Sequence, residues 1–305
     1  MNRNPNHPLN GTGVALVTPF RADLTPDYPG LRQLLSYTAR GGVNYYVVIG
    51  TTGESPTVTS REKKDILAFV KAHNDARLPV VYGIGGNNTH EVIETIRETD
   101  FDGVAAILSV SPYYSKPSQR GIYGHYTAIA DACPVPVLLY NVPARTQSNL
   151  TAETTLRLAE HPNIIGIKES SGDLVQCMHI ARHKPESFLL ISGDDLLTVP
   201  MVSLGGCGVI SVLANAFPEP FTAMVNEALA GRYALANTYL HQLLDVNPLM
   251  YAEGNPVGIK QALHELGLCA NHVRLPLAAA SEDLAREIAR QVRQIMGRPV
   301  ASRVG

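Results

Sequence analysis

Short runs of apolar residues recur along the chain, and glycine, proline or polar residues bound each of them. The runs show little alternation of apolar and polar positions, which is typical of strands buried on both faces of a parallel sheet. We predict eight strands, at residues 14–18, 45–49, 80–83, 103–108, 135–140, 164–168, 188–192 and 208–212.

The segments between these runs have the periodicity of helices. Two of them begin with capping-box patterns, Thr59 with Glu62 and Asn88 with Glu91. Strands that alternate with helices predict parallel βαβ units. Eight units in succession fit a closed (β/α)₈ TIM barrel, an α/β fold, better than an open doubly wound sheet. We expect residues 1–230 to form this catalytic barrel domain.

The strand pattern stops after about residue 230, and three helical patterns follow, at 233–246, 255–266 and 282–296. The first carries a broad apolar stripe, which could pack on the barrel or on a second subunit. We therefore expect residues 231–305 to form a C-terminal helical domain.

Composition excludes several classes of protein. The net charge of −2 and the lack of a clustered basic patch argue against nucleic acid as a partner. No apolar run is long enough to span a membrane, and the polar first ten residues do not resemble a signal peptide, so we expect a cytoplasmic protein. The four cysteines are scattered singly and are expected to be core thiols.

Neither a metal nor a cofactor is expected. His179 and His183 have the spacing of two ligands on one helix, but no third ligand is placed nearby, so an exposed helical face is the preferred interpretation. The glycine run at 83–86 lacks the third glycine of a dinucleotide fingerprint, and no phosphate-binding loop pattern occurs.

Lys168 ends the apolar run at 164–168, an unusual place for a cation. Burial of an ammonium costs desolvation free energy and favours the neutral, nucleophilic amine. On this stretch alone, a lysine that reaches solvent from a strand end remains an alternative. The other six lysines lie in different settings: Lys63, Lys64, Lys71, Lys184 and Lys260 in helical or exposed charged patterns, and Lys116 in a proline-flanked loop.

A barrel of this kind carries its chemistry at the carboxyl ends of its strands. Hydroxyls, phenols and glycines follow several of the predicted strands, in GTTGES (50–55), SPYYSKPS (111–118), YNVPART (140–146) and GDD (193–195). A single amine among phenols and hydroxyls is typical of a Schiff-base site, because carbinolamine formation and collapse require proton transfers.

At these motifs the chain resembles the dihydrodipicolinate synthase family, pyruvate-dependent class I aldolases related to N-acetylneuraminate lyase. The motifs GTTGES, PYY, YNVPxRT, IIGIKE, SGDD and GVISV occur in this order. The resemblance implies a barrel with a C-terminal helical domain and a homotetramer built as a dimer of tight dimers. It also implies condensation of pyruvate with L-aspartate 4-semialdehyde to 4-hydroxy-tetrahydrodipicolinate, in lysine and diaminopimelate biosynthesis.

The resemblance also implies a role for each matching residue. Four residues would take part in proton transfer and covalent chemistry, and three would bind the substrates. Lys168 would form the imine with pyruvate, Tyr140 would be the general acid and base, and Thr51 would link it to Tyr114 of a neighbouring subunit; Thr52 and the Ile210 backbone would hold pyruvate, and Arg145 the semialdehyde carboxylate.

Two other functions are compatible with this fold. One is another pyruvate lyase, which would cleave N-acetylneuraminate or a 2-keto-3-deoxy sugar acid. Arg145 argues against a sialic acid lyase, whose sugar substrate needs hydroxyl-binding groups in place of a second carboxylate clamp. The other is a catalytically silent ligand-binding member, which the occupied catalytic positions disfavour.

The chain departs from the family pattern at two positions. Gly254 stands where the family usually has proline before Asn255 and Pro256. Relatives inhibited by L-lysine commonly have histidine or glutamate at the position of Lys63. The ammonium of Lys63 would repel a cationic effector. We therefore expect weak or absent feedback, although Lys63 could instead point to solvent. The positions matching the effector site are Ser55, Pro56, Ser60, Lys63, Asn87, Glu91 and Tyr113.

Overall fold

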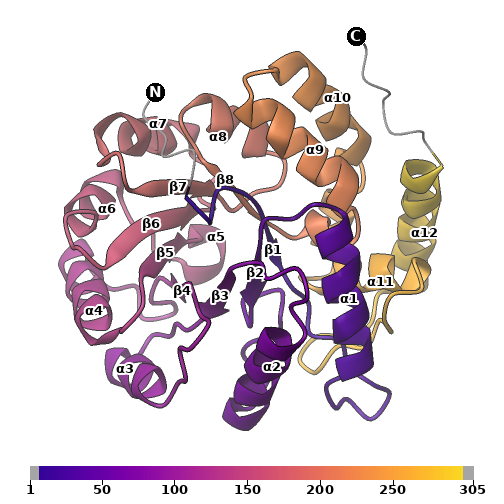
Figure 1. Ribbon diagram of the computed structural model, residues 1–305, viewed down its shortest axis with the longest axis horizontal. Coiled ribbons are helices and arrows are strands. Elements are labelled where there is room, and N and C mark those ends of the chain that lie inside the picture. Colours follow the sequence, from indigo (N-terminus) through magenta and orange to yellow (C-terminus); the bar gives the residue numbers. More distant parts are fainter. Residues whose placement is uncertain (1–6, 298–305) are drawn as a thin grey trace.

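The computed structural model describes residues 7–297 and confirms the predicted fold class. Eight parallel strands close into a barrel in chain order, β1 to β8, and helices surround them (Figure 1). The strands are β1 (Gly11–Ala15), β2 (Tyr45–Val48), β3 (Val80–Gly83), β4 (Ala106–Val110), β5 (Val137–Asn141), β6 (Ile164–Glu169), β7 (Leu189–Ser192) and β8 (Gly208–Ser211).

The predicted range of β3 is confirmed, and those of β2, β6, β7 and β8 differ from the structure by one residue at one end. The ranges predicted for β1, β4 and β5 were wrong by up to three residues, most clearly at β1. This strand begins at Gly11, and residues 16–18 already belong to the loop that follows it. Backbone pairing decides its extent: the Gly11 N–H donates to the Cys207 carbonyl at 2.9 Å, whereas the Val17 N–H donates to the Asn215 side chain. β4 likewise begins at Ala106 and not at Gly103.

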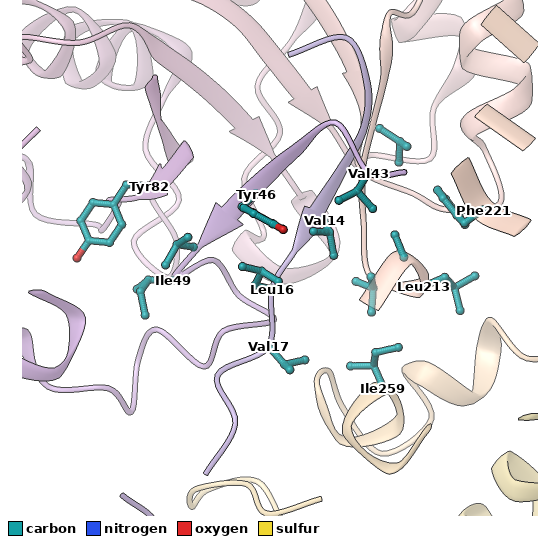
Figure 2. Close-up of a cluster of buried hydrophobic side chains, with 14 of the residues drawn as sticks. Val14, Leu16, Val17, Val43, Tyr46, Ile49, Tyr82, Leu213, Phe221 and Ile259 are labelled. Atoms are coloured by element: carbon teal, nitrogen blue, oxygen red, sulfur yellow. The ribbon is translucent and has the colours of Figure 1, made fainter. Parts of the chain in front are cut away.

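The strands bury side chains on both faces, which explains their continuous apolar pattern. Val14 and Tyr46 point outward into the core between the strands and the helices (Figure 2). Their neighbours Ala15 and Val47 point inward and fill the barrel together with side chains such as Ile210. The inner core supports the floor of any site at the carboxyl ends of the strands.

Nine helices accompany the strands within the described residues. The predicted capping box of α2 is confirmed, because Thr59 Oγ1 accepts from the Glu62 N–H and Glu62 accepts from the Thr59 N–H. The box predicted for α3 was wrong: Asn88 caps the helix through the His90 N–H at 3.1 Å, without a return bond from Glu91. The helices are α1 (Tyr28–Arg40), α2 (Ser60–Ala72), α3 (Thr89–Arg97), α4 (Gln119–Ala132), α5 (Pro143–Thr146), α6 (Ala152–Leu158), α7 (Leu174–His183), α8 (Thr198–Ser203) and α9 (Pro218–Leu229).

Further helices follow the barrel, α10 (Tyr233–Leu243), α11 (Val257–Glu265) and α12 (Glu282–Met296). Short 3₁₀ turns, η1 (Leu213–Asn215) and η2 (Pro248–Met250), precede α9 and α11. Ile259 of α11 lies in the same buried cluster as Leu213 and Val17, and this contact joins α11 to the loops after β8 and β1 (Figure 2). The division of the chain at residue 230 stays a prediction, and residues 298–305 of the second unit lie outside the described part.

Lys260 corrects one expectation from the sequence. It lies on α11, as the helical pattern predicted, but its side chain is completely buried. Its ammonium lies 2.6 Å from Glu54 Oε1, in the loop after β2, so a partner distant in sequence makes the burial possible. Lys168 is therefore not the only buried lysine in the described part of the chain.

Candidate active site

A cavity of about 600 Å³ opens at the carboxyl ends of the strands. Residues from the loops after seven of the strands, β2 to β8, and from the segment after α10 line it. Of the seven residues predicted from the sequence, five line this cavity together: Thr51, Thr52, Tyr140, Arg145 and Lys168.

Lys168 and Tyr140 meet on adjacent strands. They are direct partners in the register between β6 and β5, and both side chains are nearly buried. The Lys168 Nζ lies 4.4 Å from the centre of the Tyr140 ring. The apolar barrel interior lies beneath the pair, so the amine can meet a substrate only from the cavity side.

Gly193, directly after β7, leaves the space that the lysine side chain occupies. A Cβ at this position would lie 2.8 Å from Lys168 Cε and 1.8 Å from Ser170 Oγ. Contacts this short require displacement of the neighbouring atoms, so a larger residue here would move the amine. The glycine of the GDD motif therefore leaves room for the Lys168 side chain.

A buried polar network lies behind this pair, on the outer side of the strands. Asn141 follows Tyr140, Glu169 follows Lys168, and the Asn141 amide donates to the Glu169 carboxylate at 3.1 Å. The Ser171 N–H and the Gln176 amide donate to the same carboxylate. Burial raises the pKa of Glu169, and these hydrogen bonds oppose the rise. The network joins the ends of β5 and β6, the strands that carry the two candidate catalytic residues.

Asp195 stabilises the turn after β8. Its Oδ2 accepts from the N–H groups of Val212 and Leu213, at 3.2 and 2.8 Å. Burial raises the pKa of Asp195 to about 6, while the hydrogen bond from Leu213, the Ser211 side chain and the Lys168 charge partly oppose the rise. The carboxylate thus connects β7 to the end of β8 beside the lysine.

The turn after β2 presents Thr51 and Thr52 to the cavity. It is closed by the Gly53 N–H on the Gly50 carbonyl and by the Glu54 N–H on the Thr51 carbonyl. Glu54 has a φ of 55°, in the left-handed region that costs a non-glycine residue conformational energy. The surrounding contacts must therefore hold this turn in place.

The two remaining predicted residues lie elsewhere. Ile210 is buried inside the barrel, next to Gly13 in the β1–β8 register, and it is not among the residues that line the cavity. The prediction for Ile210 concerns its backbone, and it stays a prediction. Tyr114 is 89% exposed, has a φ of 72°, and does not line the cavity of its own chain. One chain by itself therefore does not bring Tyr114 to Thr51.

The model of the Dihydrodipicolinate synthetase family matches residues 8–295. The chain belongs to this family. A 4-hydroxy-tetrahydrodipicolinate synthase of Cytophaga hutchinsonii is 52% identical to it over 282 residues, which covers 92% of this chain and 95% of the relative.

Two solved structures of the family agree with the architecture. The chloride-inhibited dihydrodipicolinate synthase of Acinetobacter baumannii, complexed with pyruvate, superposes with a TM-score of 0.91 at 35% identity. It covers 94% of this chain and 99% of its own. The enzyme from Cyanidioschyzon merolae with lysine bound gives 0.91 at 37% identity, over 96% and 99% of the two chains.

The sequence did not reveal that the segment after α10 also lines the cavity, through Asn247, Tyr251 and Asn255. The Asn255 amide donates to Thr52 Oγ1 at 3.0 Å. The only signal was the Asn255-Pro256 pair within the family pattern, which does not show the direction of a side chain. Gly254, before it, has a φ of 99°, which proline cannot adopt.

No group of three or more histidine, cysteine or acidic side chains within residues 7–297 is arranged to hold a metal ion. His179 and His183 are exposed on α7, in line with the preferred interpretation of that pair. A helix long and apolar enough to cross a membrane is likewise absent from the described residues.

Proposed function

We propose that this chain condenses pyruvate with L-aspartate 4-semialdehyde to 4-hydroxy-tetrahydrodipicolinate, through an imine on Lys168. The observation that carries the proposal is the Lys168 amine beside the Tyr140 ring at the floor of the cavity, in a member of this family. The names of the relatives support the reaction, and the cavity supplies the functional groups that it requires.

In the proposed reaction the Lys168 amine attacks the C2 carbonyl of pyruvate, and the carbinolamine loses water to give a protonated imine. The imine withdraws electrons from C2, so a methyl proton can leave and the resulting enamine attacks the aldehyde carbon of the second substrate. The amino group of the adduct then displaces Lys168 from C2, and the ring closes. One water is released overall.

Each of these steps moves a proton, and we assign the transfers to Tyr140. Its phenol lies on the strand next to that of the amine. Thr51, at the same cavity, would pass protons between Tyr140 and Tyr114 of a neighbouring subunit. The high exposure of Tyr114 on the single chain supports this arrangement, because a tyrosine that serves its own site would be expected to line it.

Substrate selection rests on carboxylate recognition. We assign pyruvate to Thr52 and the Ile210 backbone, where hydroxyl and peptide groups can donate to a carboxylate. Arg145 lines the mouth of the cavity from α5 and would bind the carboxylate of the semialdehyde. A sugar-acid lyase would need hydroxyl-binding groups there, so Arg145 favours the condensation.

We further propose a cytoplasmic homotetramer, a dimer of tight dimers. None of the four cysteines, all within the described residues, forms a disulfide, and three are buried, which suits a reducing compartment. The contribution of Tyr114 to a neighbouring site requires at least the tight dimer.

Reduction with borohydride in the presence of pyruvate tests the proposal. We expect mass spectrometry to find the reduced pyruvate adduct on the Lys168 peptide, and none in the Lys168→Ala variant. The buried Lys260 is an internal control, because Glu54 holds its ammonium away from the cavity. Labelling of another lysine, or of none, would contradict the mechanism.

A further inference from the structure

A buried ion pair connects the C-terminal helices to the loop after β2. Lys260 Nζ of α11 lies 2.6 Å from Glu54 Oε1, and the two side chains are 0% and 1% exposed. Burial of two charges costs desolvation free energy that their attraction recovers only when the geometry is good and further hydrogen bonds are present. Stability alone is therefore a weak explanation for this buried pair, and we looked for a conformation that the pair holds in place.

The further contacts of the pair join it to residues 272–274 and to Phe20, in the loop after β1. The Lys260 ammonium also donates to the His272 carbonyl at 2.7 Å, and it lies 4.1 Å from the centre of the Phe20 ring. The second carboxylate oxygen of Glu54 accepts from the Arg274 N–H at 3.0 Å. Burial lowers the pKa of Lys260, and Glu54 opposes that shift. Both charged groups are thus fully engaged.

Glu54 belongs to the same turn as Thr51 and Thr52. Its N–H donates to the Thr51 carbonyl at 3.0 Å, and its backbone is in the left-handed region. A second contact from the C-terminal part of the chain reaches the turn, because the Asn255 amide donates to Thr52 Oγ1. From the barrel, Thr18 Oγ1 donates to the Gly53 carbonyl at 2.7 Å.

We infer that Lys260 is a positioning residue for pyruvate binding: through Glu54 it holds the turn at residues 50–55, and so Thr51 and Thr52, against the cavity. The inference rests on the proposed function. It gives the C-terminal helices a role within the site of their own chain. Arg145 lies on α5, outside this network, so the semialdehyde should bind independently of the ion pair.

Two variants separate positioning from stability. Glu54→Asp keeps both charges but shortens the side chain by one methylene. The ion pair can then form only if the turn at residues 50–55 shifts from its wild-type position, which displaces Thr51 and Thr52. The double variant Glu54→Gln/Lys260→Met removes both charges at similar volume, so no unpaired charge stays buried and stability should largely recover relative to Lys260→Met alone. Lys64→Met is the matched control, because Lys64 forms an exposed pair with Glu98.

The measured quantity is the pyruvate concentration that half-saturates the borohydride-trapped adduct, together with the KM for the semialdehyde and the melting temperature. We expect half-saturation to rise about tenfold in Glu54→Asp and in the double variant, the effect of losing one hydrogen bond to a charged substrate. The semialdehyde KM should change by less than about twofold. Lys64→Met should behave as wild type.

A pyruvate half-saturation that stays at the wild-type value in the folded variants would overturn the inference. So would a double variant in which both the stability and the half-saturation return to the wild-type values. Failure of both variants to fold would assign the pair to stability and overturn it too. Absence of any adduct on wild-type Lys168 would instead overturn the proposed function, so the two failures are distinguishable.

Discussion

Tyr140 and Lys168 are adjacent in space because of strand register alone, since 27 positions of sequence intervene between them. The Lys168 Nζ contacts the face of the Tyr140 ring, so a variant can keep that contact and lose only the hydroxyl. A phenylalanine at position 140 therefore separates proton transfer from packing.

We expect Tyr140→Phe to lower kcat by about 10²-fold or more, with a modest change in KM, because a positioned acid and base is lost. Steady-state kinetics of the condensation measure this. Tyr82→Phe is a matched control, because Tyr82 is buried on the outer face of β3, away from the cavity (Figure 2). An unaltered kcat in Tyr140→Phe would remove Tyr140 from the proton relay.

Asp195 provides a pH dependence of stability. Its pKa in the folded protein is about 6, above the ordinary value of 3.8, so the folded state binds the proton more tightly than the unfolded state. This contribution is complete below about pH 4 and is lost as the pH rises through 6. Relative to Asp195→Asn, the wild type should lose roughly 3 kcal/mol between pH 4 and 7.

Urea unfolding of both proteins at several pH values, at one protein concentration, measures this difference. The asparagine can still accept from the N–H groups of Val212 and Leu213, which keeps the turn after β8 closed. A difference between the two proteins that does not vary with pH would show that the buried carboxyl is not the titrating group.

At the level of elements, α2 places a lysine at the wall of the cavity. Lys63, on its first turns, is half-buried and lines the cavity together with Ser55, Pro56 and Tyr113. Burial lowers the pKa of Lys63, and no carboxylate of the described residues forms an ion pair with it. A cationic ligand at this wall would meet an uncompensated positive charge.

We therefore expect L-lysine to half-inhibit condensation only above about 1 mM, because two like charges at close range repel by roughly 3 kcal/mol at most. Lys63→Glu should increase sensitivity, whereas Lys64→Glu, on the exposed face of the same helix, should not. Inhibition assays across L-lysine concentrations measure both. Half-inhibition of the wild type well below that concentration would show that Lys63 does not hinder the effector.

At the scale of the whole molecule, the position of Tyr114 bears on the assembly. If it completes the site of a neighbouring subunit, Tyr114→Phe and Lys168→Ala chains are each inactive for a different reason. Mixed dimers then contain one site with both wild-type residues. Random exchange should restore about a quarter of the wild-type sites.

Activity of a mixed sample, compared with each variant alone, measures this complementation. Native mass spectrometry of the same sample shows whether the subunits have exchanged. Inactivity in a fully exchanged sample would indicate a site built within one chain, and Tyr114 would then have no role in the relay.

The order of strands and helices could be predicted from the sequence, because buried parallel strands must be apolar on both faces and helices must cover them. Lys168 could be singled out because a lysine at the end of an apolar strand contradicts that pattern. The rule that such barrels act at the carboxyl ends of their strands then selected the motifs at 50–55 and 140–146. The family resemblance assigned roles to Thr51, Thr52, Tyr140 and Arg145 within these motifs.

Other features of the site depend on contacts between segments that are far apart in the sequence. The periodicity of apolar residues does not predict such contacts. Lys260 has an ordinary helical setting in the sequence, and only the tertiary structure places Glu54, 206 residues away, against its ammonium. Asn255 reaches Thr52 for the same reason, across 203 residues. The local sequence pattern determined the barrel and the position of Lys168 in it, because each buried strand has to be apolar. The tertiary structure decided how the C-terminal helices dock on the turn after β2, because those residues are far apart in the sequence and meet only in the folded protein.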